Sequence, residues 1–191
     1  MLIACLVADS ERQVWSMARE KLRDSLVRVS NRDWSVNLAF VDSPAALVAE
    51  KADVAVISLL RALDEATTLE DLALQLERDA SALVTSGGAV FLCSIFRACA
   101  DREKLERIRR LNLLAVEISR QTGAAIIDLD RFFANFGARP LETDCRLGGA
   151  KAADFAARIM TDALLAVGFD DDVPADVLSA AQRHNRGASQ L

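Results

Sequence analysis

The sequence predicts a single three-layer α/β domain with a mainly parallel central sheet. Short apolar runs alternate along the chain with longer stretches whose apolar residues recur at helical spacing, a pattern typical of βαβ units. Glycines stand between helical stretches and the next apolar run, at Gly87-Gly88 and at Gly123, where a helix can end in a left-handed residue. We see no internal repeat, so the pattern indicates one domain.

Five apolar runs are the expected strands, at residues 2–7, 35–40, 54–58, 89–94 and 124–128. The first run, LIACLV, has the length of a buried strand and is too short for a secretory signal or a membrane span. The other runs are similarly short and are separated by longer helical stretches. Parallel strands joined by helical crossovers follow from this arrangement.

Five helices are expected, at residues 12–29, 44–51, 69–85, 102–122 and 149–167. The first carries an apolar stripe that consists of Val14, Met17, Ala18, Leu22 and Leu26. The composition becomes polar after Gly168. We therefore divide the chain into a domain at residues 1–168 and a loosely held polar tail at residues 169–191, with a short helix around residues 176–181.

Composition narrows the function classes. With 191 residues, 52% of them hydrophobic, the chain can bury one sizeable core, and its net charge of -5 disfavours nucleic-acid binding. The four cysteines lack CxxC pairing and His184 is the single histidine, so we expect reduced thiols, a cytoplasmic protein and no metal. Neither a GxGxxG turn after the first strand nor a GxxxxGK[ST] motif occurs, so no cofactor is expected.

Ligands of an open parallel sheet bind beyond the carboxyl ends of its strands. This rule selects five loops, at residues 9–10, 42–43, 59–65, 95–99 and 129–147. The first loop contains Ser10. Its hydroxyl could be a nucleophile, or it could cap the first helix by accepting a hydrogen bond from a free backbone N–H.

Four features occur in a fixed order: the Ala8-Asp9-Ser10 turn, the strands at residues 52–58 and 88–92, and Asp144 before the last helix. This arrangement resembles the SGNH (GDSL-type) hydrolase family, in which the first block reads Gly-Asp-Ser. The resemblance covers roughly residues 1–168. It implies a sheet in the order 2-1-3-4-5 with helices on both faces, Ser10 as the catalytic nucleophile and Asp144 as the carboxylate of the triad.

The chain departs from the family pattern at the positions that complete the chemistry. A serine nucleophile needs a histidine to take its proton, but Arg146 and Leu147 stand where the resemblance implies that histidine. Arginine stays protonated and cannot act as a base. Residues 41–44 and 59–62 also lack the Gly and Asn that the family uses in its oxyanion hole, and each such donor is worth about 2.7–4 kcal/mol in the transition state.

Two functional hypotheses follow. In the first, the triad and oxyanion hole are incomplete, the chain is catalytically impaired, and it serves as a binding or assembly partner for a protein or for a small-molecule ester or anion. In the alternative, it is an active serine ester hydrolase, a deacetylase or esterase of sugar or lipid esters, that uses Ser10 with an unconventional base. A receiver-like signalling domain shares the strand order. It is disfavoured because the third strand is not followed by an aspartate.

Charged side chains gather in the same loops. They are Asp9, Asp42, Asp64, Glu65 and Asp144, with Arg61, Arg97 and Arg146. They either form a carboxylate cluster with basic counter-charges or remain solvated loop charges. We expect Arg146 to contribute an anion site near the start of the last helix, on the same cleft as Ser10. Asp9, Arg61 and Arg146 are the candidate ligand-binding residues.

Overall fold

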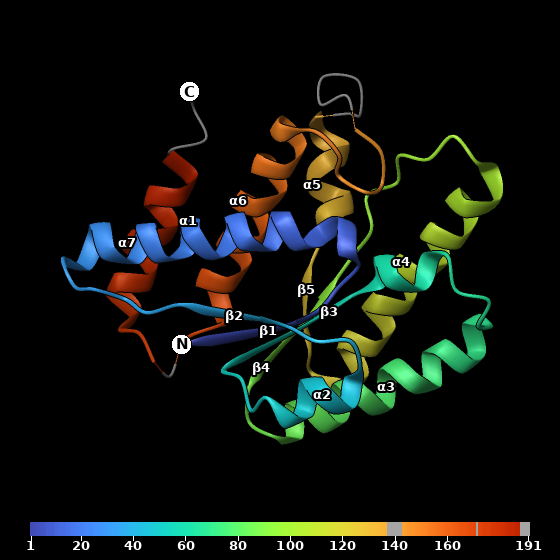
Figure 1. Cartoon of the computed structure of the whole chain (residues 1–191), viewed down its shortest axis with the longest axis horizontal. Helices are drawn as coiled ribbons and strands as arrows, with labels where there is room; N and C mark the ends of the chain where they lie inside the picture. Colours follow the sequence, from blue (N-terminus) through green and yellow to red (C-terminus); the bar gives the residue numbers. More distant parts are fainter. Residues whose placement is uncertain (137–142, 171, 188–191) are drawn as a thin grey trace.

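The computed structural model describes residues 1–136, 143–170 and 172–187. Its centre is a five-stranded sheet in the order β2-β1-β3-β4-β5, in which every neighbouring pair is parallel (Figure 1). The strands are β1 (Leu2–Leu6), β2 (Asn37–Phe40), β3 (Val54–Ser58), β4 (Ala89–Cys93) and β5 (Ala125–Ile127). The predicted α/β domain and its strand order are confirmed.

Helices cover both faces of the sheet (Figure 1). One face carries α1 (Arg12–Ser30), α6 (Ala150–Val167) and α7 (Ala175–Gly187), the other α2 (Pro44–Ala49), α3 (Leu69–Thr85) and α4 (Arg102–Thr122), while α5 (Leu129–Phe136) follows β5. Alternate side chains of β1 enter the two cores: Ile3 and Cys5 pack with the α1 side, and Ala4 and Leu6 pack with the α3 side. Burial on both faces explains why β1 and β4 are continuously apolar.

Two short 3₁₀ helices follow strands at the carboxyl edge of the sheet, and the sequence analysis did not predict them. They are η1 (Asp9–Glu11), after β1, and η2 (Leu59–Leu63), after β3. Most of η2 is buried, with Arg61 half-buried at its centre. The loops after β1 and β3 therefore both begin as short hydrogen-bonded turns.

The helix ends follow local sequence signals. The side chains of Ser43, Thr68 and Asp101 accept hydrogen bonds from backbone N–H groups in the first turns of α2, α3 and α4. Gly123 ends α4 with a φ of 83°, in the left-handed region that glycine adopts without strain. Among the helices of the described part of the chain, none is both long and apolar enough to cross a membrane.

Residues 172–187 differ from the loose tail that was expected at residues 169–191. Instead of a short helix at residues 176–181, α7 spans Ala175–Gly187 and packs against both α1 and α6. Leu178 and Ala181 are buried in this contact. Their helical spacing gives α7 an apolar side that the polar composition of the segment hid. The last four residues of the chain and one residue of the preceding loop lie outside the described part.

Candidate functional site

The turn after β1 presents Ser10 to solvent. Ser10 lies inside η1, whose N-cap is Ala8, and the N-cap of α1 is Glu11. The Ser10 side chain is exposed, and among the described residues we find no hydrogen bond to its hydroxyl. The interpretation of Ser10 as a helix cap is therefore wrong. Its hydroxyl is free for another role.

Glu11 is the buried acid at this edge, and the sequence analysis missed it. The residue is 2% exposed; its Oε1 accepts a hydrogen bond from Ser58 Oγ at 2.7 Å, and its Oε2 accepts one from Ala8 N at 2.9 Å. Burial raises the pKa of Glu11 to about 7, although both hydrogen bonds act to lower it. The Glu11 contact with Ala8 N is one half of a capping box, but Ala8 has no side-chain oxygen for the other half, so the sequence lacks the usual Ser/Thr-x-x-Glu signal.

Asp9 and Asp42 share one arginine. Arg12 Nε lies 3.0 Å from Asp9 Oδ1, and Arg12 Nη2 lies 3.3 Å from Asp42 Oδ1. The Arg12 guanidinium also lies 5.3 Å from the centre of the Phe40 ring. These contacts join the carboxyl ends of β1 and β2. Because both carboxylates are strongly exposed, the ion pairs stabilise the fold only weakly.

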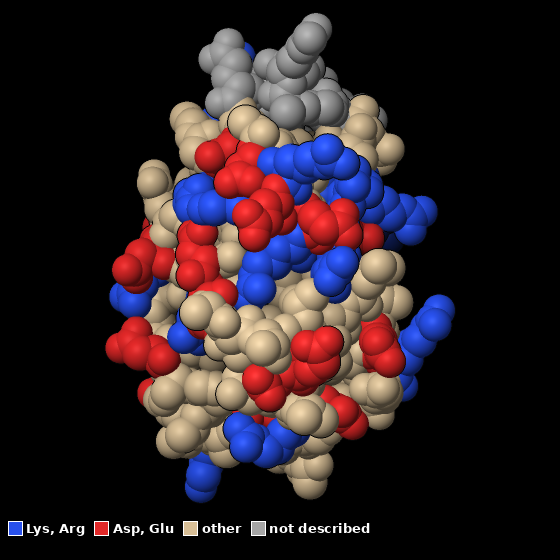
Figure 2. Space-filling model, turned by 90° about the vertical axis from the view of Figure 1, so that its right-hand side faces the viewer, with Lys and Arg blue, Asp and Glu red and all other residues tan. Residues whose placement is uncertain are grey.

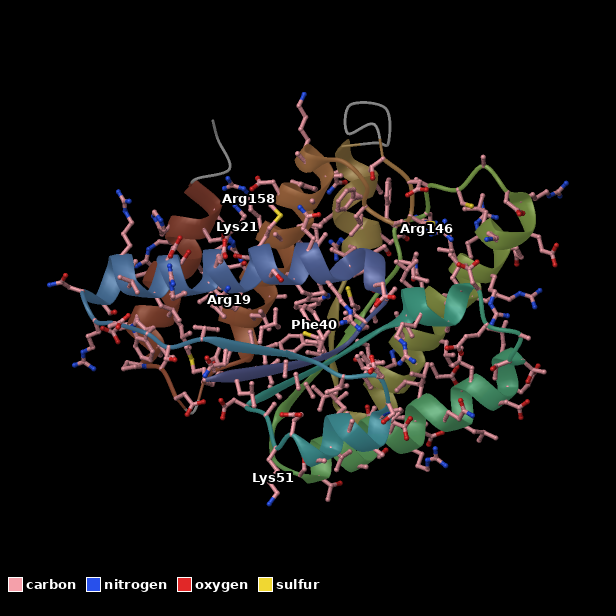
Figure 3. The ribbon with its side chains drawn as sticks, viewed as in Figure 1. Arg19, Lys21, Phe40, Lys51, Arg146 and Arg158 are labelled. Atoms are coloured by element: carbon pink, nitrogen blue, oxygen red, sulfur yellow. The ribbon has the colours of Figure 1, made fainter. Side chains whose placement is uncertain are left out.

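Asp144 and Arg146 lie in the loop before α6. Asp144 Oδ1 accepts a hydrogen bond from Arg146 N at 2.8 Å, so this carboxylate binds its own turn. Arg146 Nη2 donates to Asp64 Oδ2 at 2.9 Å, and Lys104 Nζ donates to Asp64 Oδ1 at 2.7 Å. The Lys104 hydrogen bond is the main cause of a lowered pKa of Asp64. Figure 3 shows Arg146 on the side of the molecule where α1 begins.

Of the two alternatives left open by the sequence, the charged side chains of this edge form separate ion pairs rather than one carboxylate cluster. Asp9 and Asp42 share Arg12, Asp64 is bound by Arg146 and Lys104, and Arg97 Nε lies 2.6 Å from Asp130 Oδ2. In the described ranges, no three His, Cys, Asp or Glu side chains are grouped so that they could hold a metal ion. The structure thus pairs Arg146 with Asp64. Among the described residues, Asp9 pairs with Arg12 and with neither Arg61 nor Arg146.

Arg61 differs from Arg12, Arg97 and Arg146 because we find no ion pair for it among the described residues. It is half-buried and borders a cavity of about 140 Å³. Ser58, Gln75 and apolar side chains of β1, β3 and α3 line the same cavity, as do the acidic Glu65 and Asp79. A guanidinium beside a small, mainly apolar cavity can bind a carboxylate in a bidentate manner.

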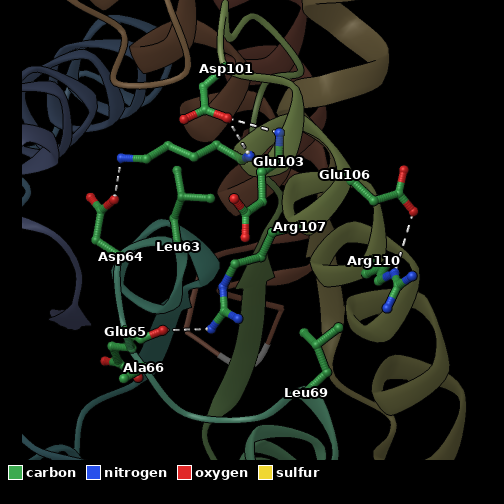
Figure 4. Close-up of a pocket in the computed structure, with 11 residues that line it drawn as sticks. Leu63, Asp64, Glu65, Ala66, Leu69, Asp101, Glu103, Glu106, Arg107 and Arg110 are labelled. Atoms are coloured by element: carbon green, nitrogen blue, oxygen red, sulfur yellow. Dashed lines mark hydrogen bonds and ion pairs between the residues drawn. The ribbon is translucent and has the colours of Figure 1, made fainter.

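A larger groove of about 610 Å³ lies between residues 63–69 and the first turns of α4 (Figure 4). Arg107 forms its wall. Its guanidinium donates to the backbone oxygens of Ala62 at 2.9 and 3.0 Å, of Glu65 at 3.0 Å and of Thr67 at 3.1 Å. Arg107 therefore fixes the segment that carries Asp64. In the view toward this side of the molecule, acidic and basic side chains are intermingled (Figure 2).

The single histidine of the chain, His184, lies in α7. This helix packs beside α1 and α6, near the end of α1 that is remote from η1 (Figure 1). Neighbouring residues on α7 bind α6: Arg186 forms two hydrogen bonds of 2.8 Å with the Asp162 carboxylate. His184 is thus part of a packed helix, and this helix lies near the end of α1 that is remote from the turn carrying Ser10.

The five-stranded parallel sheet and its flanking helices match the fold of solved SGNH hydrolases. Three solved structures with this fold are similar to the chain: an acetyl xylan esterase, AlAXEase (13% identity, TM-score 0.59), a proposed SGNH hydrolase from Slackia heliotrinireducens (16%, 0.55) and TesA (19%, 0.55). The alignments cover 86%, 86% and 85% of this chain and 100%, 98% and 94% of those proteins. No family model matches the sequence, and no curated protein is significantly similar to it.

Proposed function

We propose that this chain is an SGNH-hydrolase-like protein that does not hydrolyse esters through Ser10 and acts instead as a binding or assembly component. The observation that carries the proposal is the environment of Arg146. Arg146 and the buried Leu147 stand where the resemblance implies the catalytic histidine, and the Arg146 guanidinium binds Asp64. An arginine in an ion pair cannot take the proton of a serine hydroxyl.

The other titratable groups of this edge support the same conclusion. The Glu11 carboxyl has a pKa of about 7, as a general base should, but its oxygens accept hydrogen bonds from Ser58 and Ala8, and its side chain is buried. Asp144 binds the backbone N–H of Arg146. A hydroxyl without a base is a poor nucleophile at neutral pH, so Ser10 lacks the activation that the reaction needs.

The alternative function is that of an active ester hydrolase, and the exposed, unbonded hydroxyl of Ser10 favours it. Its substrates would be acetylated sugars or lipid esters, the first of which agrees with the name of the similar acetyl xylan esterase. A base that approaches Ser10 only with the substrate bound would be required. This alternative and the first proposal make opposite predictions for one reagent.

The test is a fluorophosphonate probe, which labels activated serines, together with hydrolysis of a short-chain nitrophenyl ester. We expect wild type, Ser10→Ala and Ser43→Ala to give the same low labelling and turnover. Ser43→Ala is the matched control, because it removes a serine at the same sheet edge and leaves Ser10 intact. Labelling of wild type and Ser43→Ala that disappears in Ser10→Ala would establish the hydrolase instead.

For the ligand, we propose a small carboxylate or similar anion that binds Arg61, with Arg146 and Asp9 at the rim of the same edge. Arg61 is favoured because Arg12 and Arg146 are already in ion pairs. Thermal shift assays with acetate, phosphate and sulfate at constant ionic strength test this. Stabilisation that Arg61→Gln loses and Arg146→Ala retains supports the assignment; equal shifts in wild type and Arg61→Gln refute it. The free thiols favour a cytoplasmic location as part of the proposal.

A further inference from the structure

Two cysteines of the carboxyl edge lie on loops that touch. Cys145 N donates a hydrogen bond of 2.8 Å to Ala98 O, so the loop before α6 runs beside the loop after β4. Standard backbone dimensions then place the α-carbons of Cys99 and Cys145 roughly 4.5–6.5 Å apart. Disulfide-bonded cysteines have α-carbons about 4.4–6.8 Å apart. The backbone therefore allows a bond between these residues.

The side chains of both residues enter the same apolar cluster. Cys145 is 3% exposed and belongs to the core on the α3 side of the sheet, and the half-buried Cys99 packs against that core. The two thiols also interact electrostatically: after burial and the Asp144 charge, Cys99 is a further cause of the raised pKa of Cys145. Both thiols therefore lie in one cluster beside the contact between the two loops.

The other two cysteines are an internal contrast. Cys5 lies on β1 and Cys93 on β4, with β3 between them. Two strand spacings separate them by at least ~9 Å, which is too far for a disulfide. Both are completely buried, and burial raises the pKa of each thiol well above its ordinary value. They should be inert toward reagents in solution.

We propose that Cys99 and Cys145 form a reversible intramolecular disulfide by exchange with a low-molecular-weight disulfide of the glutathione type. The Cys99 thiolate attacks one sulfur of oxidised glutathione, the S–S bond of glutathione breaks, and one glutathione leaves as a thiolate that takes up a proton. Cys145, after losing its proton, attacks the Cys99 sulfur and releases the second glutathione. Two protein thiols are oxidised and one glutathione disulfide is reduced to two thiols.

The order of the two steps follows from exposure. Cys99 is the accessible thiol and reacts first, whereas Cys145 is buried and reacts with the mixed disulfide beside it. The product would join the loop after β4 to the turn that holds Asp144 and Arg146. Oxidation would thereby fix the loop that carries the Arg146–Asp64 ion pair, and reduction would leave it held by noncovalent contacts alone.

The test is disulfide mapping on the folded, reduced protein. Wild type, Cys99→Ser and Cys145→Ala are incubated with oxidised glutathione at about pH 8, where thiolate is available, then alkylated, digested and analysed by mass spectrometry. We expect wild type to lose two hydrogens and to yield a peptide that links Cys99 to Cys145. Cys145→Ala should keep glutathione on Cys99, and Cys99→Ser should remain reduced.

Three results would overturn the proposal: no reaction of the wild type, glutathione retained on wild-type Cys99 without the internal link, or a link that includes Cys5 or Cys93. If Cys145→Ala does not fold, Cys99→Ser still decides the test, because Cys99 is only half-buried and its replacement should leave the fold intact. Reduction of the linked product with dithiothreitol should return all four free thiols. A product that resists reduction would also contradict the exchange mechanism.

Discussion

η1 and the loop at residues 143–149 correspond to the nucleophile and acid–base blocks of the SGNH resemblance, and different forces hold them. Glu11, a buried carboxyl bound to Ser58 and Ala8, anchors η1. The second loop is anchored by an exposed ion pair between Arg146 and Asp64. Charge–charge attraction between exposed groups is screened by salt, whereas a buried carboxyl responds to pH. The two loops should therefore lose stability under different conditions: the η1 loop as the pH rises, and the loop at residues 143–149 as the salt concentration rises.

The largest expected effect is a pH dependence that belongs to the η1 anchor. Because the pKa of Glu11 is raised from 4.5 to about 7, the folded state binds a proton that the unfolded state has lost. This stabilisation is complete below about pH 4.5 and disappears as the pH rises through about 7. Relative to Glu11→Gln, wild type should lose about 2–3 kcal/mol of unfolding free energy between about pH 5 and pH 8.

Urea denaturation of both proteins across that range provides the measurement. Glu11→Gln is the matched control because an amide imitates the protonated carboxyl and does not titrate. Parallel pH profiles for the two proteins would show that Glu11 does not titrate differently in the folded state. The pH dependence expected for the η1 loop would then be wrong.

The second expected effect concerns the segment to which the 143–149 loop is bound. Arg107 donates to three backbone oxygens of residues 62–67, and these would be left without their donor in Arg107→Ala. Hydrogen bonds from a charged group are worth about 1.5–3 kcal/mol, so we expect a loss of about 2 kcal/mol in unfolding free energy. Arg110→Ala is the control: Arg110 pairs only with the half-exposed Glu106, and its loss should be below ~0.5 kcal/mol. Equal losses in the two variants would contradict the anchoring role.

Local patterns in the sequence predict the elements of the fold well. The apolar run of β3 and the helical stripe of α1 predict burial directly, because the spacing of apolar residues along the chain indicates which face of each element is buried. α7 was misjudged because its buried Leu178 and Ala181 are few among polar residues. Its packing depends on where α1 and α6 lie in space, and no local pattern reports that position.

Most contacts of the candidate site could not be predicted from the sequence. Asp64 and Arg146 are 82 residues apart, so their ion pair depends on how two loops approach in the folded chain. Glu11 follows the exposed Ser10, and the sequence around it does not indicate that its side chain is buried. The resemblance gave the correct order of the loops. It could not state which charged side chain would pair with which, because exposed pairs form by proximity rather than by motif.

The third prediction tests the weaker anchor. A double-mutant cycle of Arg146→Ala and Asp64→Ala should give a coupling of about 0.2–1 kcal/mol at low salt, because both side chains are about half exposed. The coupling should fall further at about 1 M NaCl, where the Debye screening length is about 3 Å. Thermal or urea unfolding of the four proteins measures it. A coupling that salt leaves unchanged would mean that the second loop, like the first, is held in a low-dielectric environment.

The smallest expected effect is that of Ser10→Ala. An N-cap serine typically contributes about 1 kcal/mol, and Ser43 is such a residue, since its Oγ accepts a hydrogen bond from Ala46 N at 3.2 Å. Ser10 has no cap position in η1 or α1, so Ser10→Ala should change the unfolding free energy by only a few tenths of a kcal/mol. Ser43→Ala, measured by urea denaturation under the same conditions, should lose about 1 kcal/mol. A loss of similar size in Ser10→Ala would mean that its hydroxyl is engaged in solution. A clear gain would indicate a strained functional position, and the active hydrolase would then become the better explanation of this turn.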